Sequence, residues 1–251
     1  ALPQGNAQRT AFAGFGDPQF DSKQTKAPVP AQVTMRNMGI RRVTEAALRD
    51  GSAPVNYIPY SSLPPLPDTR DEILAIAQAL KADVSRDVFL GAAASKQSLK
   101  SANLANRRIV AFATHGLVTG DFPNLDQPAL ALSSPDGKAE SGLLTLEEIL
   151  QLKLDADWVL LSACNTAAGD GAGAEAISGL GRGFFYAGSR ALLVTHWPVE
   201  TVSAKILVTK IFERYAGNST LTRAEALRQA HLSVIDEHAT EGGKPTYSYR
   251  S

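Results

Sequence analysis

The chain has 251 residues, of which 44% are hydrophobic and 20% charged, and this composition suits one large or two small globular domains with an ample core. Lysine plus arginine equal aspartate plus glutamate at 25 each, so no basic field would recruit nucleic acid or an anionic membrane surface. The single cysteine excludes internal disulfides and the usual multi-cysteine zinc sites, and it is typical of a reducing, cytoplasmic compartment.

Neither a leader nor a membrane anchor is predicted from the printed residues. No apolar stretch approaches the roughly 18 to 20 residues that span a bilayer. The first residues lack a basic segment followed by an apolar run. Ala1 is not a methionine, and Pro245–Ser251 resembles the approach to a further strand. We therefore interpret the chain as a domain excised from a longer protein and truncated at both ends.

Few regular elements are expected in the first part of the chain. Residues 1–30 are rich in Gln, Gly and Pro, and they predict an extended lead-in with an early strand near residues 11–15. A short helix at Arg41–Asp50 and a strand at Val55–Tyr60 follow. The proline-rich Ser61–Pro67 must be extended, because proline fixes φ and restricts the residue before it.

From residue 68 onward, strands alternate with helices. The predicted helices are Asp68–Ala82, which Asp68 caps, Ser95–Leu104, Leu146–Leu150, Ala174–Ala187, Thr201–Tyr215 and Thr222–Glu237. The predicted strands are Val84–Leu90, Arg108–Thr114, Ala129–Leu132, Trp158–Leu161 and Arg190–Thr195. This alternation predicts an α/β domain over residues 31–251, with a mostly parallel central β-sheet and helices on both faces.

Two of these strands end in side chains that carry chemistry. The run Arg107–Gly116 is an apolar strand that ends at His115, and Asp157–Thr166 is a second one that ends at Cys164. Ligands of open α/β sheets bind beyond the carboxyl ends of the strands. A histidine from a neighbouring strand end supplies the base that a cysteine needs to become a nucleophile. The alternative is that Cys164 is an inert, buried small hydrophobe, as lone cysteines often are.

Order and spacing favour the catalytic interpretation. His115 precedes Cys164 by 49 residues (164 − 115). In caspases the histidine likewise lies roughly 50 residues upstream of the cysteine, although the local caspase signature around the cysteine is absent here.

Five ordered motifs resemble the CHAT domain in content and order. They are Leu63–Arg70 (LPPLPDTR), Ala113–Gly116 (ATHG), Leu161–Thr166 (LSACNT), Gly179–Phe184 (GLGRGF) and His196–Val199 (HWPV). CHAT domains are caspase-like cysteine peptidases related to separase, in the clan of caspases, gingipains and legumain. The sequence departs from the family pattern at His196, where leucine is usual, at Glu200, where aspartate is usual, and after Tyr249, where a closing strand is expected.

The resemblance implies a caspase-like (caspase-hemoglobinase) fold and a bacterial cysteine endopeptidase with a His/Cys dyad. Cys164 would attack the peptide carbonyl, His115 would act as base and acid, and the backbone N–H groups of Gly116 and Cys164 would hold the oxyanion. The chemistry needs no metal or organic cofactor. The implied partners are a protein or peptide substrate and a regulatory sensor or helical-repeat region in the full-length chain, with neither nucleic acid nor membrane.

The substrate pocket would be formed partly by the segment after the strand that ends at Thr195. Trp197, with His196, would line it, and Glu200 would select Arg or Lys through charge-assisted hydrogen bonds. The alternative pocket carboxylates are Asp121 and Asp126, in the loop after His115. The remaining alternative is that Glu200 only stabilises the start of the helix that follows.

Three rival interpretations remain open. Gly171–Ala176 fits the dinucleotide-binding pattern Gly-x-Gly-x-x-Gly/Ala, but Ser162–Asp170 separates it from the strand, where the fingerprint requires a tight turn. His231 and His238, seven positions apart on one helix, lack a carboxylate as a third metal ligand, so a solvated face is favoured. A catalytically silent CHAT domain that acts as a protein-interaction scaffold would need neither His115 nor Cys164.

Overall fold

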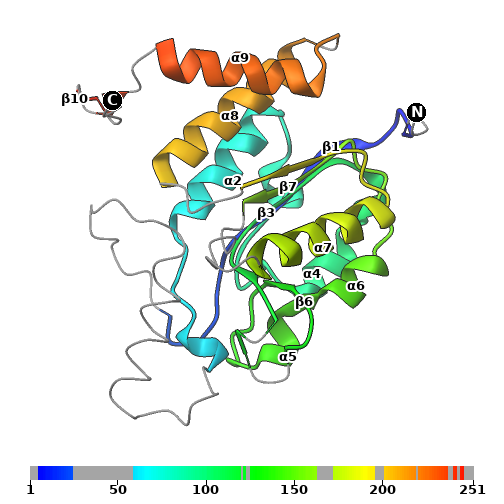
Figure 1. The fold of residues 1–251 in the computed structure, drawn as a ribbon, viewed down its shortest axis with the longest axis vertical. Coiled ribbons are helices and arrows are strands. Elements are labelled where there is room, and N and C mark those ends of the chain that lie inside the picture. The colour runs from blue at the N-terminus through cyan, green and yellow to red at the C-terminus, as the bar shows by residue number, and fades with distance from the viewer. Residues whose placement is uncertain are drawn as a thin grey trace.

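The computed structural model describes residues 5–24, 59–119, 121–122, 125–162, 172–195, 201–218, 220–236, 240–241 and 244–245. Its main sheet has five strands in the order β2-β1-β3-β7-β8, and every neighbouring pair is parallel. The strands are β1 (Thr10–Pro18), β2 (Val88–Gly91), β3 (Arg107–Ala113), β7 (Trp158–Ser162) and β8 (Leu192–Val194). The predicted α/β fold with a mostly parallel central sheet is confirmed (Figure 1).

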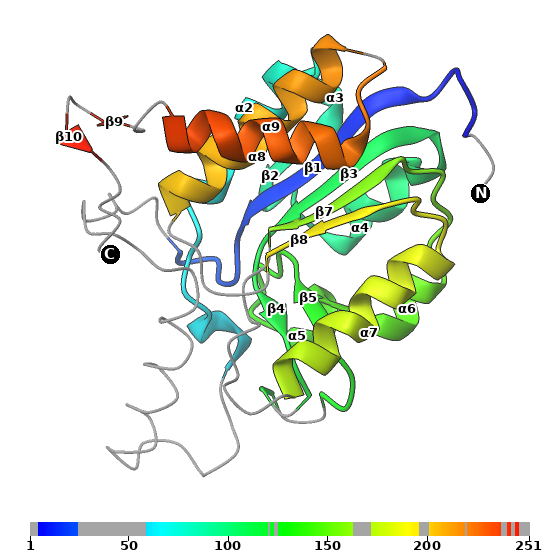
Figure 2. The ribbon, with the colours of Figure 1, turned by 45° about the horizontal axis from the view of Figure 1, so that its top comes forward.

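Helices cover both faces of this sheet, as Figures 1 and 2 show. One face carries α4 (Lys96–Ser101), α6 (Leu146–Leu150) and α7 (Ala172–Tyr186), and the other carries α2 (Asp68–Ala79), α8 (Thr201–Gly217) and α9 (Arg223–Asp236). Each face has its own apolar core, because side chains alternate between the two faces of a strand. Phe112 and Val159 pack on the first face, and Ile109 and Trp158 pack on the second.

The central strands are buried on both faces, which is the pattern that a parallel sheet under two helical layers requires. All five residues of β7 are buried, and so is every residue of β3 except Arg108. The early strand expected near residues 11–15 is β1, and it lies between β2 and β3. The predicted domain boundary at residue 30 falls outside the described residues.

Helix α2 packs very closely on β1, and glycine makes this approach possible. A Cβ atom at Gly16 would lie 2.9 Å from the backbone oxygen of Thr69 and 2.8 Å from the side chain of Ile73. At Gly14 it would lie 2.7 Å from Ile73. Only a residue without a side chain leaves room for the helix at these positions.

A second, antiparallel sheet lies beyond the carboxyl ends of the main strands (Figure 2). Its order is β4-β5-β6, with β4 at Gly116–Leu117, β5 at Ala129–Ala131 and β6 at Leu143–Thr145, and α5 (Ala139–Gly142) leads into β6. A third apolar cluster forms its core, with Phe20, Tyr60, Leu63, Leu117, Phe122 and Leu125 among its buried members. The strand predicted at Ala129–Leu132 therefore belongs to this sheet.

Several predicted elements differ in detail from the structure. The strand predicted at Val84–Leu90 begins instead as a helical turn, α3 (Val84–Asp87), because the Asp83 carboxylate accepts the backbone N–H of Ser85 at 3.0 Å and caps it. Asp68 is the first residue of α2, and the capping position belongs to Pro67. The remaining short elements are η1 (Tyr60–Ser62), η2 (Leu104–Asn106), β9 (Thr240–Glu241) and β10 (Lys244–Pro245). The predicted helix at 41–50 lies outside the described residues, as does most of the predicted strand at 55–60.

The amino edge of the main sheet is held by an ionic cluster, which we call the arginine–aspartate cluster. Asp157, immediately before β7, contacts Arg9 at 3.1 Å and Arg108 at 3.2 Å, and Arg190 pairs with Asp155. The side chain of Arg9 is only 6% exposed. These pairs connect the segments before β1, β7 and β8 with the start of β3.

Within the described ranges, no helix combines the length and the hydrophobicity needed to cross a lipid bilayer.

Candidate active site

His115 lies two residues beyond the end of β3 and is 1% exposed. Its Nε2 lies 2.8 Å from the backbone oxygen of Pro64. A carbonyl oxygen only accepts, so Nε2 carries the proton and donates it. In the neutral imidazole the lone pair is then on Nδ1. The extended segment before α2 thus fixes both the tautomer and the orientation of the histidine.

One aromatic side chain, Phe20, lies against the imidazole, and two others extend the cluster behind it. The ring centroids of Phe20 and His115 are 5.5 Å apart, and Tyr60 meets Phe20 edge-on at 5.6 Å. Phe122 lies 6.0 Å from Tyr60. The Tyr60 hydroxyl donates to the Leu132 backbone oxygen at 2.5 Å, and burial raises the pKa of Tyr60 well above its usual value. An aromatic cluster therefore lies on the Phe20 side of the histidine.

The backbone around His115 is fixed by β5. The His115 carbonyl accepts the N–H of Ala131 at 2.9 Å, and the buried Thr114 hydroxyl donates to the Ala131 carbonyl. Gly116 is buried and opens β4, where it pairs with Leu130. The chain thus turns directly from the central sheet into the small sheet at this residue.

The neighbouring strand β7 runs in register with β3 toward the same edge. Ala113 pairs with Ser162, the last residue of β7, and Ser162 is fully buried. Cys164 lies outside the described residues. Its distance from His115 therefore stays a prediction, and so does the role of its backbone N–H in the oxyanion hole.

Two of the three carboxylates predicted for the substrate pocket, Asp121 and Asp126, belong to the described residues. The Asp121 carboxylate accepts the backbone N–H of Val118 at 2.7 Å, so it closes a turn in the loop after β4. Asp126 is exposed. Trp197 and Glu200 lie outside the described residues, between the end of β8 at Val194 and the start of α8. The assignment of a pocket carboxylate stays a prediction.

In a comparison with protein-family models, residues 2–250 match the CHAT domain. The chain belongs to the CHAT domain family. The caspase-like resemblance inferred from the five motifs is confirmed by this match. No curated protein matches the sequence.

In this CHAT domain, the dinucleotide-binding alternative conflicts with the observed element bounds. Strand β7 ends at Ser162 and α7 begins at Ala172, so residues 163–171 separate them. The phosphate-binding fingerprint needs the tight strand-to-helix turn that these bounds lack. Among the described residues, no group of three or more His, Cys, Asp or Glu side chains is arranged to hold a metal ion.

Sequence reasoning missed the residues that hold His115 in place. Pro64 belongs to a motif singled out for its resemblance to the family, but nothing in the sequence connects its carbonyl with a histidine 51 positions later. Phe20, Tyr60 and Phe122 come from three separate segments and meet only in the folded chain. The only sequence signal was the density of prolines before α2, which predicts a rigid extended segment.

Proposed function

We propose that this CHAT domain is a cysteine endopeptidase that cleaves a protein substrate, with Cys164 as the nucleophile and His115 as the general base and acid. The observation that carries the proposal is the orientation of His115 by Pro64 at the carboxyl edge of the sheet. A base must be held in one tautomer to work as a proton acceptor, and a hydrogen bond on its other nitrogen achieves this.

The strand register supports the pairing of the two side chains. Ala113 and Ser162 are partners across β3 and β7, and His115 and Cys164 each follow two positions later. Neighbouring strands lie about 4.8 Å apart. Side chains that follow strand ends at that spacing can reach the same carbonyl carbon, which supports the proposed pairing of His115 with Cys164.

In the proposed reaction, Nδ1 of His115 takes the thiol proton of Cys164, and the sulfur attacks the peptide carbonyl carbon. The N–H groups of Gly116 and Cys164 donate to the resulting oxyanion. His115 then returns the proton to the leaving amine, and the C–N bond breaks to leave a thioester. Water, deprotonated by His115, hydrolyses the thioester and restores the thiol. No metal or organic cofactor enters these steps.

We propose that the enzyme cleaves preferentially after Arg or Lys. Glu200 would be the carboxylate of the substrate pocket, and Trp197 would form one of its walls. Asp121 is the weaker candidate because its carboxylate closes a turn with Val118. The exposed Asp126 is the second alternative. Replacing Glu200 with Gln removes the charge and keeps the shape, and it should lower kcat/KM for basic substrates by about tenfold or more. Equal kinetics for Glu200→Gln and wild type would reject this assignment.

We further infer that the domain works in a reducing, cytoplasmic compartment, since the reaction needs a free thiolate. An upstream sensor or helical-repeat region, or a partner protein, would control it. This inference rests on the family resemblance. A longer natural chain should therefore cut its partner only when the sensor is triggered, whereas the isolated domain should show a low, constant rate.

The proposed function is tested with a positional peptide library. Wild type and Cys164→Ala are incubated with the library, and mass spectrometry identifies the residue that precedes each cut. We expect cleavage by wild type, concentrated after Arg and Lys, and none by Cys164→Ala. Equal patterns for both proteins would show a contaminating peptidase. No cleavage by either protein, also in the presence of the upstream region, would favour a catalytically silent scaffold.

A further inference from the structure

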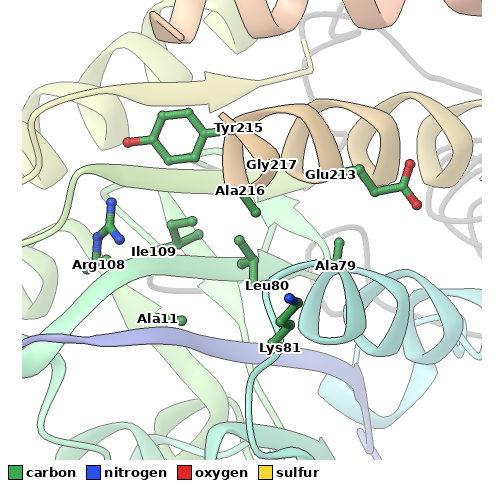
Figure 3. Close-up of a pocket in the computed structure, with 10 residues that line it drawn as sticks. All are labelled: Ala11, Ala79, Leu80, Lys81, Arg108, Ile109, Glu213, Tyr215, Ala216 and Gly217. Carbon is green, nitrogen blue, oxygen red and sulfur yellow. The ribbon is translucent and has the colours of Figure 1, made fainter. Parts of the chain in front are cut away.

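A cavity of about 420 Å³ opens at the amino edge of the main sheet (Figure 3). The carboxyl-terminal ends of α2 and α8 form its rim, and the first residues of β1 and β3 lie beneath them. Leu80, Ile109 and Ala216 give it apolar walls. Lys81 and Arg108 bring positive charge to the lining, and Tyr215 adds an aromatic ring.

This cavity is separate from the candidate active site. Ile109 lies near the start of β3, whereas His115 follows the opposite end of that strand. The cavity is also unrelated to the small antiparallel sheet that surrounds the histidine, since none of the lining residues belongs to it. A ligand bound here would not occupy the position of the scissile peptide.

The Lys81 ammonium group is the feature of the cavity that favours an anionic ligand. Within the part of the chain that the structure describes, the ammonium group of Lys81 has neither an ion pair nor a hydrogen bond. Arg108 is held in place by Asp157, at 3.2 Å from its Nε. Figure 3 shows the third charged side chain, Glu213, directed away from Lys81, Arg108 and Tyr215. A carboxylate bound at the Lys81 ammonium group would form a charge-assisted hydrogen bond.

The remaining walls favour an apolar body of limited size. Cavities of roughly 300 to 1,000 Å³ accommodate small organic ligands, and such sites combine apolar walls with a few placed polar groups. The Tyr215 ring offers a flat surface for an aromatic or aliphatic group. We propose that this cavity is a second binding site, which takes an organic carboxylate whose apolar body packs between Leu80, Ile109 and Tyr215.

Three probes that share one body and differ in charge test the proposal: 4-phenylbutyrate, 4-phenylbutanol and 4-phenylbutylamine. Binding is followed by amide chemical shifts in NMR titrations of the whole chain. We expect saturable shifts at the ends of α2 and α8 with the carboxylate, and binding roughly tenfold weaker or absent with the alcohol and the amine. Equal or tighter binding of the amine would overturn the proposal, and so would an absence of saturable shifts at these helix ends.

Two variants connect the binding to the cavity. Lys81→Gln removes the charge and shortens the side chain by only one atom, so it should weaken the binding of 4-phenylbutyrate by about tenfold. Lys100→Gln, on an exposed position of α4 away from the cavity, is the matched control and should leave binding unchanged. Ala216→Trp places an indole at the rim on an exposed position, and it should abolish binding without loss of the fold. Undiminished binding by Lys81→Gln and Ala216→Trp would contradict the assignment of the site.

Discussion

The two edges of the central sheet hold their buried polar side chains with different kinds of partner. At the carboxyl edge, His115 is held by a backbone carbonyl and a neutral aromatic cluster. At the amino edge, arginines surround Asp155 and Asp157 in the arginine–aspartate cluster. The Pro64 carbonyl orients the His115 ring without placing a full charge beside it, whereas ion pairs hold the strand ends together at the amino edge. We therefore expect substitutions at the carboxyl edge to change activity and substitutions at the amino edge to change stability.

The largest expected effect is on activity at the carboxyl edge. Glutamine at position 115 can still donate to the Pro64 carbonyl, but it lacks the basic Nδ1. We expect His115→Gln to lower kcat by at least about 100-fold, because general base catalysis contributes roughly that much or more. The free energy of unfolding should change by no more than about 2 kcal/mol. Peptide cleavage and urea unfolding measure the two quantities, and near-normal cleavage would contradict the role of His115.

At the amino edge the expected effect is on stability alone. Asp157→Ala leaves the buried Arg9 without one of its carboxylate partners, and breaking such a pair costs about 3 to 5 kcal/mol. The activity per folded molecule should not change. The control is Arg228→Ala, which breaks the exposed pair with Glu225 at 2.6 Å. This control should cost only about 0.5 kcal/mol. Equal midpoints of urea unfolding for the two variants would contradict the claim that the ion pairs of Asp157 stabilise the fold.

Glycine substitutions compare the close packing at one edge with open space at the other. Gly16→Ala brings a Cβ to 2.9 Å from the Thr69 backbone oxygen, so α2 must shift away from β1. Such overpacking should lower the free energy of unfolding by about 1 to 3 kcal/mol. Gly217, at the end of α8, has nothing within 4 Å of the added atom. Gly217→Ala should change stability by less than about 0.5 kcal/mol. In urea, a larger loss of unfolding free energy for Gly217→Ala than for Gly16→Ala would contradict the close packing of α2 on β1.

The smallest effect concerns Tyr60, beside the histidine. Tyr60→Phe leaves the Leu132 carbonyl without its donor, which should cost about 1 to 2 kcal/mol at neutral pH. Burial raises the pKa of Tyr60, so the folded protein keeps the phenol protonated while the unfolded chain ionises near pH 10. The free energy of unfolding should therefore fall as the pH rises above about 10.

The variant removes this titration, so its stability should be less sensitive to alkali than that of wild type. Urea unfolding at several pH values between 7 and 11 measures the difference. Identical slopes of stability against pH above pH 10 for both proteins would contradict the burial of the Tyr60 hydroxyl.

The elements that sequence analysis predicted best are those with long apolar runs. Strands β3 and β7 are buried on both faces, so a continuous apolar run in the sequence predicts each of them. His115 follows β3 and Cys164 follows β7 in the sequence. At Val84–Asp87 the apolar pattern was misleading. The local hydrogen bond between Asp83 and Ser85 starts a helical turn there, and such bonds compete with extended structure.

The small antiparallel sheet could not be predicted in the same way. Strands β4 and β6 have only two and three residues, too few to show any periodicity. The contact of His115 with Pro64 joins a side chain to a distant backbone oxygen, and a carbonyl has no residue type to mark it. Sequence patterns identify which side chains carry chemistry, whereas the partners that orient them follow from the tertiary fold.

The rate of alkylation at Cys164 tests the central claim most directly, because this residue is the only cysteine in the chain. Intact mass after iodoacetamide treatment gives the rate at each pH for wild type and for His115→Ala. We expect wild type to react rapidly at pH 6 to 7, and His115→Ala to follow the profile of a free thiol with pKa near 8.5. Superimposable pH profiles for the two folded proteins would show that the histidine does not activate the cysteine.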